Sequence, residues 1–70
     1  MKISFTYHAE YRLEKRKLQK EEVLAAIKYP NKIFKKHGLY YYQKKLNRGK
    51  IEIVCERTEK DIEVITIYWL

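Results

Sequence analysis

The stretch KIEIVCERTEKDIEVITIY, residues 50–68, decides the fold class of this 70-residue chain. Within residues 50–57, apolar and polar side chains alternate, which is the two-residue period of a strand with one buried face. Residues 62–68 carry bulky side chains at neighbouring positions, which is typical of a central strand covered on both faces. Residues 58–61 predict the turn between them. The stretch therefore indicates two neighbouring strands of an antiparallel sheet.

Further strands are expected upstream of this pair. Residues 39–46 are rich in aromatic side chains, which favour pleated structure, and residues 47–49 predict a short hairpin turn with glycine at its end. Residues 32–37 form another expected strand, which ends before a glycine turn signal. Residues 2–6 fit either a short first strand or an extended lead-in. The sheet is therefore expected to have three or four antiparallel strands.

Two helices are expected before the sheet. Residues 7–17 lack proline and glycine, and Thr6 is available as N-cap. Residues 20–29 gather their apolar side chains on one helix face and end before Pro30, although Gln19 is a poor N-cap. The sequence thus predicts an α+β fold in which two N-terminal helices pack on an antiparallel sheet. Because 70 residues supply only one core, we expect a single domain over residues 1–70.

Composition narrows the range of functions. With 16 Lys and Arg against 9 Asp and Glu, the chain has a net charge of +7, which attracts polyanions such as RNA. No apolar run approaches the roughly 18 residues that cross a bilayer, and no export signal is expected. The only cysteine, Cys55, alternates with isoleucines and is expected to be a buried thiol in a reducing cytoplasm. No metal-ligand or phosphate-loop motif is present, so no cofactor is expected.

A cationic edge is expected on the first helix. His8, Arg12 and Arg16 follow one another at intervals of four residues and share one side. Tyr7 and Tyr11 border this edge and are expected to be buried. An imidazole can transfer a proton near neutral pH, and guanidinium groups can hold a phosphate. The alternative is that the histidine caps or packs and the arginines pair with nearby glutamates.

Two further groups of residues can contact a ligand. Tyr40, Tyr42 and Lys44 share one face of their strand, where aromatic rings beside cations can stack bases and hold phosphates. The alternative is that this face belongs to the core. Thr66 and Tyr68 share a face of the last strand, where the phenol can donate a hydrogen bond to a phosphate or leaving oxygen. The alternative there is a half-buried tyrosine near the chain end.

Residues 7–30, YHAEYRLEKRKLQKEEVLAAIKYP, resemble the opening of the domain of unknown function 4258 family. The strands IEIVCE and VITIY also resemble that family, and the resemblance covers nearly the whole chain. Its specific part is His8-Ala9 with Arg12 and Arg16, together with Thr66-x-Tyr68. The family is similar to RelE-like toxins, which are small, metal-independent ribonucleases. The resemblance therefore implies a RelE-like domain with an RNA-facing cleft.

We therefore expect a toxin-like, RNA-binding, metal-independent endoribonuclease of a toxin–antitoxin system. The catalytic residues implied by the resemblance are His8 as general base or acid, Arg12 and Arg16 on the scissile phosphate, and Tyr68 at the leaving oxygen. Additional RNA contacts are expected from residues on the strands and turns: Tyr40, Tyr42, Lys44, Arg48 and Arg57.

The expected partners are RNA, in particular on the ribosome, and an acidic antitoxin protein, in the cytoplasm and without a membrane. Two other classes of function fit the same sequence. One is a non-catalytic nucleic-acid- or ribosome-binding module. The other is a small protein-interaction domain that pairs through a strand edge.

Overall fold

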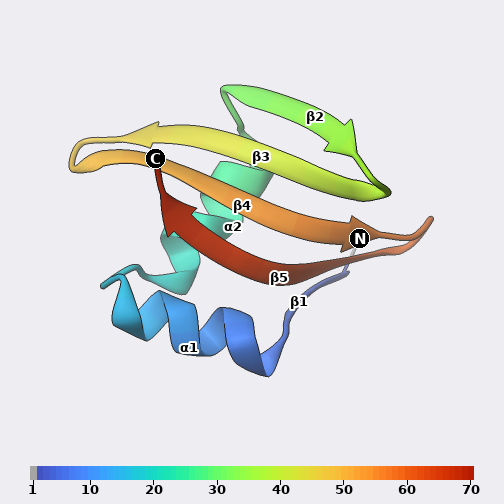
Figure 1. Ribbon diagram of the computed structural model, residues 1–70, viewed down its shortest axis with the longest axis horizontal. Coiled ribbons are helices and arrows are strands. Elements are labelled where there is room, and N and C mark those ends of the chain that lie inside the picture. The colour runs from blue at the N-terminus through green and yellow to red at the C-terminus, as the bar shows by residue number, and fades with distance from the viewer. Residues whose placement is uncertain (1) are drawn as a thin grey trace.

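The computed structural model describes residues 2–70 and has two helices and five strands (Figure 1). The elements, in chain order, are β1 (Lys2–Phe5), α1 (Tyr7–Lys15), α2 (Lys20–Lys28), β2 (Lys32–Lys36), β3 (Leu39–Leu46), β4 (Gly49–Arg57) and β5 (Asp61–Trp69). The α+β class and the two N-terminal helices are confirmed. Both helices are shorter than expected, and α1 is followed by Lys17, whose φ of 55° is incompatible with a continuing helix.

The sheet differs from the prediction in strand number and direction. Its five strands lie in the order β1-β5-β4-β3-β2, and β1 runs parallel to β5 while all other pairs are antiparallel. The expectation of three or four antiparallel strands is therefore wrong. The four residues of β1 have too little pattern to identify a strand, and their partner in the sheet, Asp61–Val64, lies at the other end of the chain.

α1 completes the edge of the sheet that β1 begins. β1 pairs with the first half of β5, and α1 then lies along the second half (Figure 1). The hydroxyl of Thr6 donates to the Ile65 carbonyl at 3.1 Å and accepts from the Ala9 amide at 3.0 Å, so the predicted N-cap is confirmed. Further along, Nε of Arg16 donates to the Ile67 carbonyl at 3.1 Å. These side chains satisfy carbonyl groups that an exposed edge strand would present to solvent.

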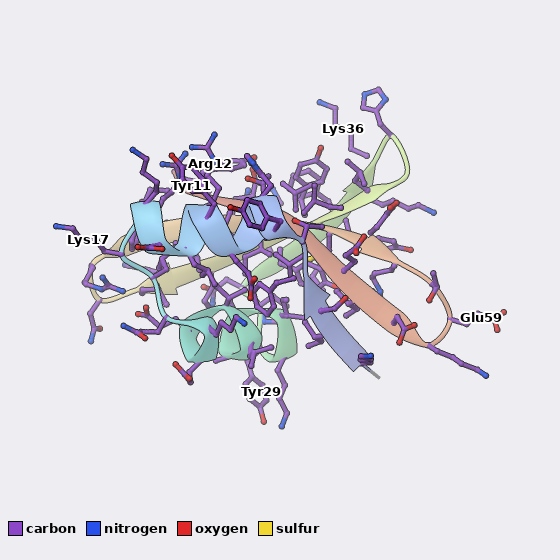
Figure 2. All side chains as sticks on the ribbon, turned by 90° about the horizontal axis from the view of Figure 1, so that it is seen from below. Tyr11, Arg12, Lys17, Tyr29, Lys36 and Glu59 are labelled. Carbon is purple, nitrogen blue, oxygen red and sulfur yellow. The ribbon has the colours of Figure 1, made fainter. Side chains whose placement is uncertain are left out.

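The two faces of the sheet have different neighbours. α2 packs on one of them, which we call the helix-covered face, and Figure 2 shows α2 on that side of the sheet only. The core lies there, and the predicted alternation of β4 is confirmed because Ile51, Ile53 and Cys55 are each fully buried in it. The opposite side, which we call the open face, carries alternate residues of β2 to β5: Lys32, Phe34, Lys36, Leu39, Tyr41, Gln43, Lys45, Lys50, Glu52, Val54, Glu56, Glu63, Thr66 and Tyr68.

A β-bulge in β5 decides which of its side chains reach the open face. Val54 pairs with Thr66, but its neighbour Cys55 pairs with Val64, so Ile65 is an extra residue. Val64 and Ile67 are consequently both buried in the core, although regular alternation places them on opposite faces. The bulge turns Thr66 and Tyr68 outward. It also explains why this strand has bulky residues at neighbouring positions.

Two tight turns connect the strands as the glycines predict. The β2–β3 turn consists of His37 and Gly38, with φ angles of 52° and 78°, so both are in the left-handed region typical of a two-residue hairpin. Gly49, with a φ of 143°, ends the β3–β4 turn. A Cβ at that position would come within 3.3 Å of the Trp69 ring. Both the backbone conformation and the close ring therefore favour glycine here.

Candidate nucleic-acid interface

The position of α1 brings its cationic edge beside the open face. Thr6 is anchored at Ile65, and a helix rises about 1.5 Å per residue where a strand rises about 3.3 Å. Along the shared direction, His8 is therefore level with Thr66, and Arg12 is level with Tyr68. Figure 2 shows Arg12 on the side of α1 that points away from α2, which is the side of the open face. His8 and Arg12 thus lie on the helix beside β5, while the Tyr68 hydroxyl of that strand is directed to Glu52 of β4 on the side away from α1.

His8 and Arg12 form a pair on α1. Nε of Arg12 donates to Nε2 of His8 at 3.3 Å, so this ring nitrogen acts as an acceptor. His8 is exposed and Arg12 is half-buried, so both can be reached by a ligand on the open face.

Arg16, the third cation of the edge, braces α1 against the sheet. Its guanidinium donates to the Ile67 carbonyl, and its own carbonyl accepts from Nε1 of Trp69 at 3.2 Å. These two contacts join the end of α1 to the end of β5. Arg16 therefore stabilises the position of α1 on the sheet.

Tyr68 belongs to a row of three hydrogen-bonded side chains across the open face. The Tyr68 hydroxyl donates to one oxygen of Glu52, and Nε2 of Gln43 donates to the other at 2.8 Å. Glu52 is only 6% exposed although it faces away from the core. Burial, the hydrogen bond to Glu52 and its charge raise the pKa of Tyr68 to about 12. The phenol therefore keeps its proton at neutral pH.

Sequence reasoning missed Glu52 as a site residue. Gln43, Glu52 and Tyr68 are consecutive in space because they pair across three strands, at separations of 9 and 16 residues. A polar residue at an outward position of β4 was visible in the alternation, but its partners follow only from the register. The burial of its carboxylate follows from that register as well.

The open face also carries an aromatic platform that sequence reasoning did not identify. The rings of Phe34 and Tyr41 are stacked, with centroids 5.0 Å apart and planes within 3° of each other. Nζ of Lys32 lies 5.6 Å from the Phe34 centroid. Lys36 and Lys45 are exposed on the same face. Half-buried rings beside lysines suit the stacking of bases and the binding of backbone phosphates.

The two tyrosines predicted to contact RNA lie on the helix-covered face instead. Tyr42 is 2% exposed in the core, where burial raises its pKa, and its ring is not accessible for stacking. Tyr40 is half-buried between two cations, with Arg57 at 4.7 Å and Lys35 at 5.4 Å from its centroid. The alternative, that this face of β3 belongs to the core, is therefore the correct one. β3 presents Tyr41 to the open face, and Tyr40 and Tyr42 to the other side.

Lys44 and Arg48 make contacts within the fold. Nζ of Lys44 donates to the Tyr29 carbonyl at 2.7 Å. The Arg48 guanidinium donates to both carboxylate oxygens of Glu22 at 2.6 Å and to the Lys17 carbonyl at 3.1 Å. These contacts attach β3 and the β3–β4 turn to α2 and the loop before it. The side chains stabilise the fold on the side of the sheet away from the open face.

Other parts of the surface are less suited to an anionic ligand. A hollow of about 680 Å³ lies between α1 and the start of α2, but its three glutamates, Glu10, Glu14 and Glu21, outnumber its two lysines, Lys17 and Lys20, and carboxylates repel phosphates. Cys55 is fully buried, so the expectation of a buried thiol is confirmed, and burial raises its pKa to about 12. Within residues 2–70, no group of His, Cys, Asp or Glu side chains is arranged to hold a metal ion. None of the described helices is long and apolar enough to cross a membrane.

Comparison with known proteins supports one part of the resemblance. Neither the curated proteins nor the solved structures include a significant match to the chain. The likeness to RelE-like toxins therefore stays a prediction. A family model described as Domain of unknown function (DUF4258) matches residues 5–69, which include all of the open face and α1. Because this match covers nearly the whole chain, the protein belongs to the DUF4258 family.

Proposed function

We propose that this protein binds single-stranded RNA on its open face and cleaves it without a metal ion, by attack of the RNA's own 2′-hydroxyl. The observation that supports this proposal is that α1, which carries the His8–Arg12 pair, runs along β5, the strand that presents Tyr68 on the open face. α1 supplies the pair at the edge of the sheet, and the β5 bulge turns the phenol to the open face. A base, a cation and a hydroxyl donor are the groups that this reaction requires.

The reaction begins when Arg12 moves from Nε2 of His8 to the phosphate, and the freed Nε2 accepts the proton of the 2′-hydroxyl. The 2′-oxygen then forms a bond to phosphorus, and Arg12 stabilises the negative charge that develops on the non-bridging oxygens. The bond from phosphorus to the 5′-oxygen breaks, and that oxygen takes a proton from Tyr68. Water returns the proton from His8 to Tyr68, and the products are a 2′,3′-cyclic phosphate and a 5′-hydroxyl.

The raised pKa of Tyr68 suits a donor and excludes a base. At a pKa of about 12 the phenol is protonated at neutral pH, yet it is a stronger acid than an alcohol leaving group. Its hydroxyl donates to Glu52 in the absence of RNA, so it must turn from Glu52 to the leaving oxygen during cleavage. Glu52 and Gln43 hold it on the open face until then.

A toxin–antitoxin role is the biological setting that we propose for this activity. An mRNA interferase needs access to messenger RNA, including RNA on the ribosome, and therefore acts in the cytoplasm. The net charge of +7 attracts an acidic antitoxin as well as RNA. An acidic partner over Arg12 and the lysines of the open face would exclude RNA and stop cleavage.

The direct test is cleavage of a mixed-sequence RNA in a metal chelator, with and without added ribosomes. The wild-type chain and His37→Asn should release fragments that end in 2′,3′-cyclic phosphate, and His8→Ala should release none. His37→Asn is a matched control because it removes the other histidine, which lies in the β2–β3 turn where asparagine tolerates a positive φ. Equal cleavage by His8→Ala would remove His8 from the mechanism. The absence of fragments under both conditions would exclude cleavage.

A non-catalytic RNA-binding module is the second candidate. It is favoured by the contacts that Tyr68 and Arg16 already make within the fold, to Glu52 and to the Ile67 carbonyl. RNA binding that weakens with salt, without fragments in either cleavage assay, would support this candidate, because phosphate contacts release counterions.

A further inference from the structure

Two exposed tyrosines stand on the outer side of α1. Tyr7 is 88% exposed and Tyr11 is 49% exposed, although the sequence led us to expect both to be buried. They are four residues apart, so their rings lie one above the other on the helix surface. We call this pair the tyrosine ridge. α1 contributes Ala9 and Leu13 to the hydrophobic core of the protein, and the tyrosine ridge is not part of that core.

Cations connect the tyrosine ridge to the open face. The guanidinium carbon of Arg12 lies 6.0 Å from the Tyr11 centroid, and Nζ of Lys15 lies 5.9 Å from it. At about 100° per residue, His8 and Lys15 lie between the ridge and Arg12 around the helix. A path from the open face over α1 therefore meets cations first and then two aromatic rings.

The chemistry of this path favours a nucleic acid over a protein partner. An apolar protein surface on the ridge would bury Arg12 and Lys15 without opposing charge, at a cost in desolvation. A nucleic acid supplies a phosphate for each cation and a base for each ring. Two acidic residues border the ridge: Glu10 forms an ion pair with Lys20 at 2.7 Å, and Glu14 lies beside Tyr11 with Lys15 as the neighbouring cation.

We propose that a single RNA strand bound on the open face continues across α1, with its phosphates on Arg12 and Lys15 and its bases stacked on the tyrosine ridge. This inference rests on the proposed function, since it extends the RNA path that begins at Tyr68. It assigns the protein a preference for unpaired RNA. Paired bases cannot leave their stack to lie on the two rings.

The test is the affinity of a fluorescently labelled, unstructured RNA, measured by anisotropy. Substituting both ridge residues, Tyr7→Ser with Tyr11→Ser, should weaken binding by roughly tenfold or more, because each base stacked on an aromatic ring contributes substantially to affinity. The pair Tyr7→Phe with Tyr11→Phe should bind as the wild type does, because both rings remain. A hairpin RNA of the same composition should bind more weakly than the unstructured strand.

Tyr29→Ser is the matched control. Tyr29 is 63% exposed and has Nζ of Lys28 at 5.5 Å from its centroid, so it resembles Tyr11 in exposure and in its cation. Figure 2 shows it on the opposite side of the molecule, beyond α2. Its substitution should leave RNA affinity unchanged.

The two proposals fail in different ways. If the wild type binds RNA and the double serine variant binds equally well, the ridge has no role while open-face binding stands. If Tyr29→Ser weakens binding as much as the double variant, stacking is not localised on α1, and the inference is likewise overturned. If the wild type binds no RNA, both the inference and the proposed function are overturned.

Discussion

At the scale of single residues, Glu52 is the most informative side chain of the open face. It is the buried carboxylate of this face, whereas Glu56 and Glu63 are exposed, and both its oxygens accept hydrogen bonds from neighbouring strands. A buried charge without partners is costly, so Gln43 and Tyr68 are required for Glu52 to remain there. The hydrogen bond to this carboxylate also determines where the Tyr68 hydroxyl points.

Glu52→Gln should lower the pKa of Tyr68 from about 12 towards its ordinary value of 10. A glutamine at position 52 has a single side-chain oxygen, and that oxygen accepts the hydrogen bond from Gln43. Its NH₂ group would therefore face Tyr68 and donate to the phenol oxygen, which favours the phenolate. An ultraviolet titration of tyrosinate absorbance measures the change, and Tyr68→Phe identifies which part of the titration belongs to Tyr68.

The same shift predicts a dependence of stability on pH. Because the folded-state pKa of Tyr68 lies above its unfolded value, its contribution is complete below about pH 10 and is lost as the pH rises towards 12. The decline measured by urea unfolding over this range should be smaller in Glu52→Gln than in the wild type. Identical tyrosinate titrations in the two proteins would show that Glu52 does not control Tyr68.

At the scale of elements, the two helices are attached to the sheet in different ways. α1 lies along the edge of β5 through Thr6 and Arg16, whereas α2 covers one face and is joined to the β3–β4 turn by Arg48 and Glu22. The Arg48 guanidinium carbon also lies 5.5 Å from the Trp69 ring. Arg48 therefore connects the start of α2, the turn and the end of β5.

Arg48→Met should destabilise the fold by about 1 kcal/mol, because it removes a bidentate but partly exposed ion pair and a cation–π contact. Urea unfolding of this variant, of Glu22→Gln and of the double variant would measure the coupling between the two side chains. RNA affinity should remain within about twofold of the wild type, because Arg48 contacts α2 and not the open face. A large loss of RNA affinity without a loss of folding stability would show that Arg48 contacts RNA.

The Arg48–Glu22 pair also affects stability in acid. The pKa of Glu22 is lowered, first by the hydrogen bond from the Gln19 amide and then by Arg48. A lowered folded-state pKa contributes stability that is present above the ordinary value of 4.5 and is lost as the pH falls below it. Arg48→Met should reduce this loss only in part, because the Gln19 amide still donates to the carboxylate.

At the scale of the whole molecule, the charge of +7 is shared between two kinds of cation. Some, such as Arg48 and Lys44, are hydrogen-bonded to groups of the fold. Others, such as Arg12 and the lysines of the open face, are directed towards solvent along the proposed RNA path. Net charge alone does not distinguish the two kinds, whereas their contacts do.

RNA affinity should fall steeply as salt concentration rises, and Arg12→Ala should reduce the slope of log K against log salt by about 1. His8→Ala should leave the slope unchanged, because Nε2 of His8 accepts a hydrogen bond from Arg12 and does not donate to a phosphate. Anisotropy titrations at several potassium chloride concentrations measure these slopes. A slope near zero for the wild type would contradict phosphate binding on this surface.

The sequence by itself determined most elements of this protein, β1 excepted. The apolar face of residues 20–29 located α2, the alternation of residues 50–57 identified the buried face of β4, and Thr6 before a stretch without proline or glycine located α1. These features depend on the geometry of the chain over a few residues, and the order of side chains along the sequence therefore encodes them. The burial of the Cys55 thiol follows from the same alternation.

Only the tertiary structure decided which side chains share a surface. The parallel pairing of β1, the bulge at Ile65 that turns Tyr68 outward, and the row that buries Glu52 all depend on contacts between distant parts of the chain. The choice of Tyr41 over Tyr40 and Tyr42 for the open face depends on which side of β3 meets α2. A strand's period defines two faces but does not say which of them a helix will cover, because that is set by packing between elements.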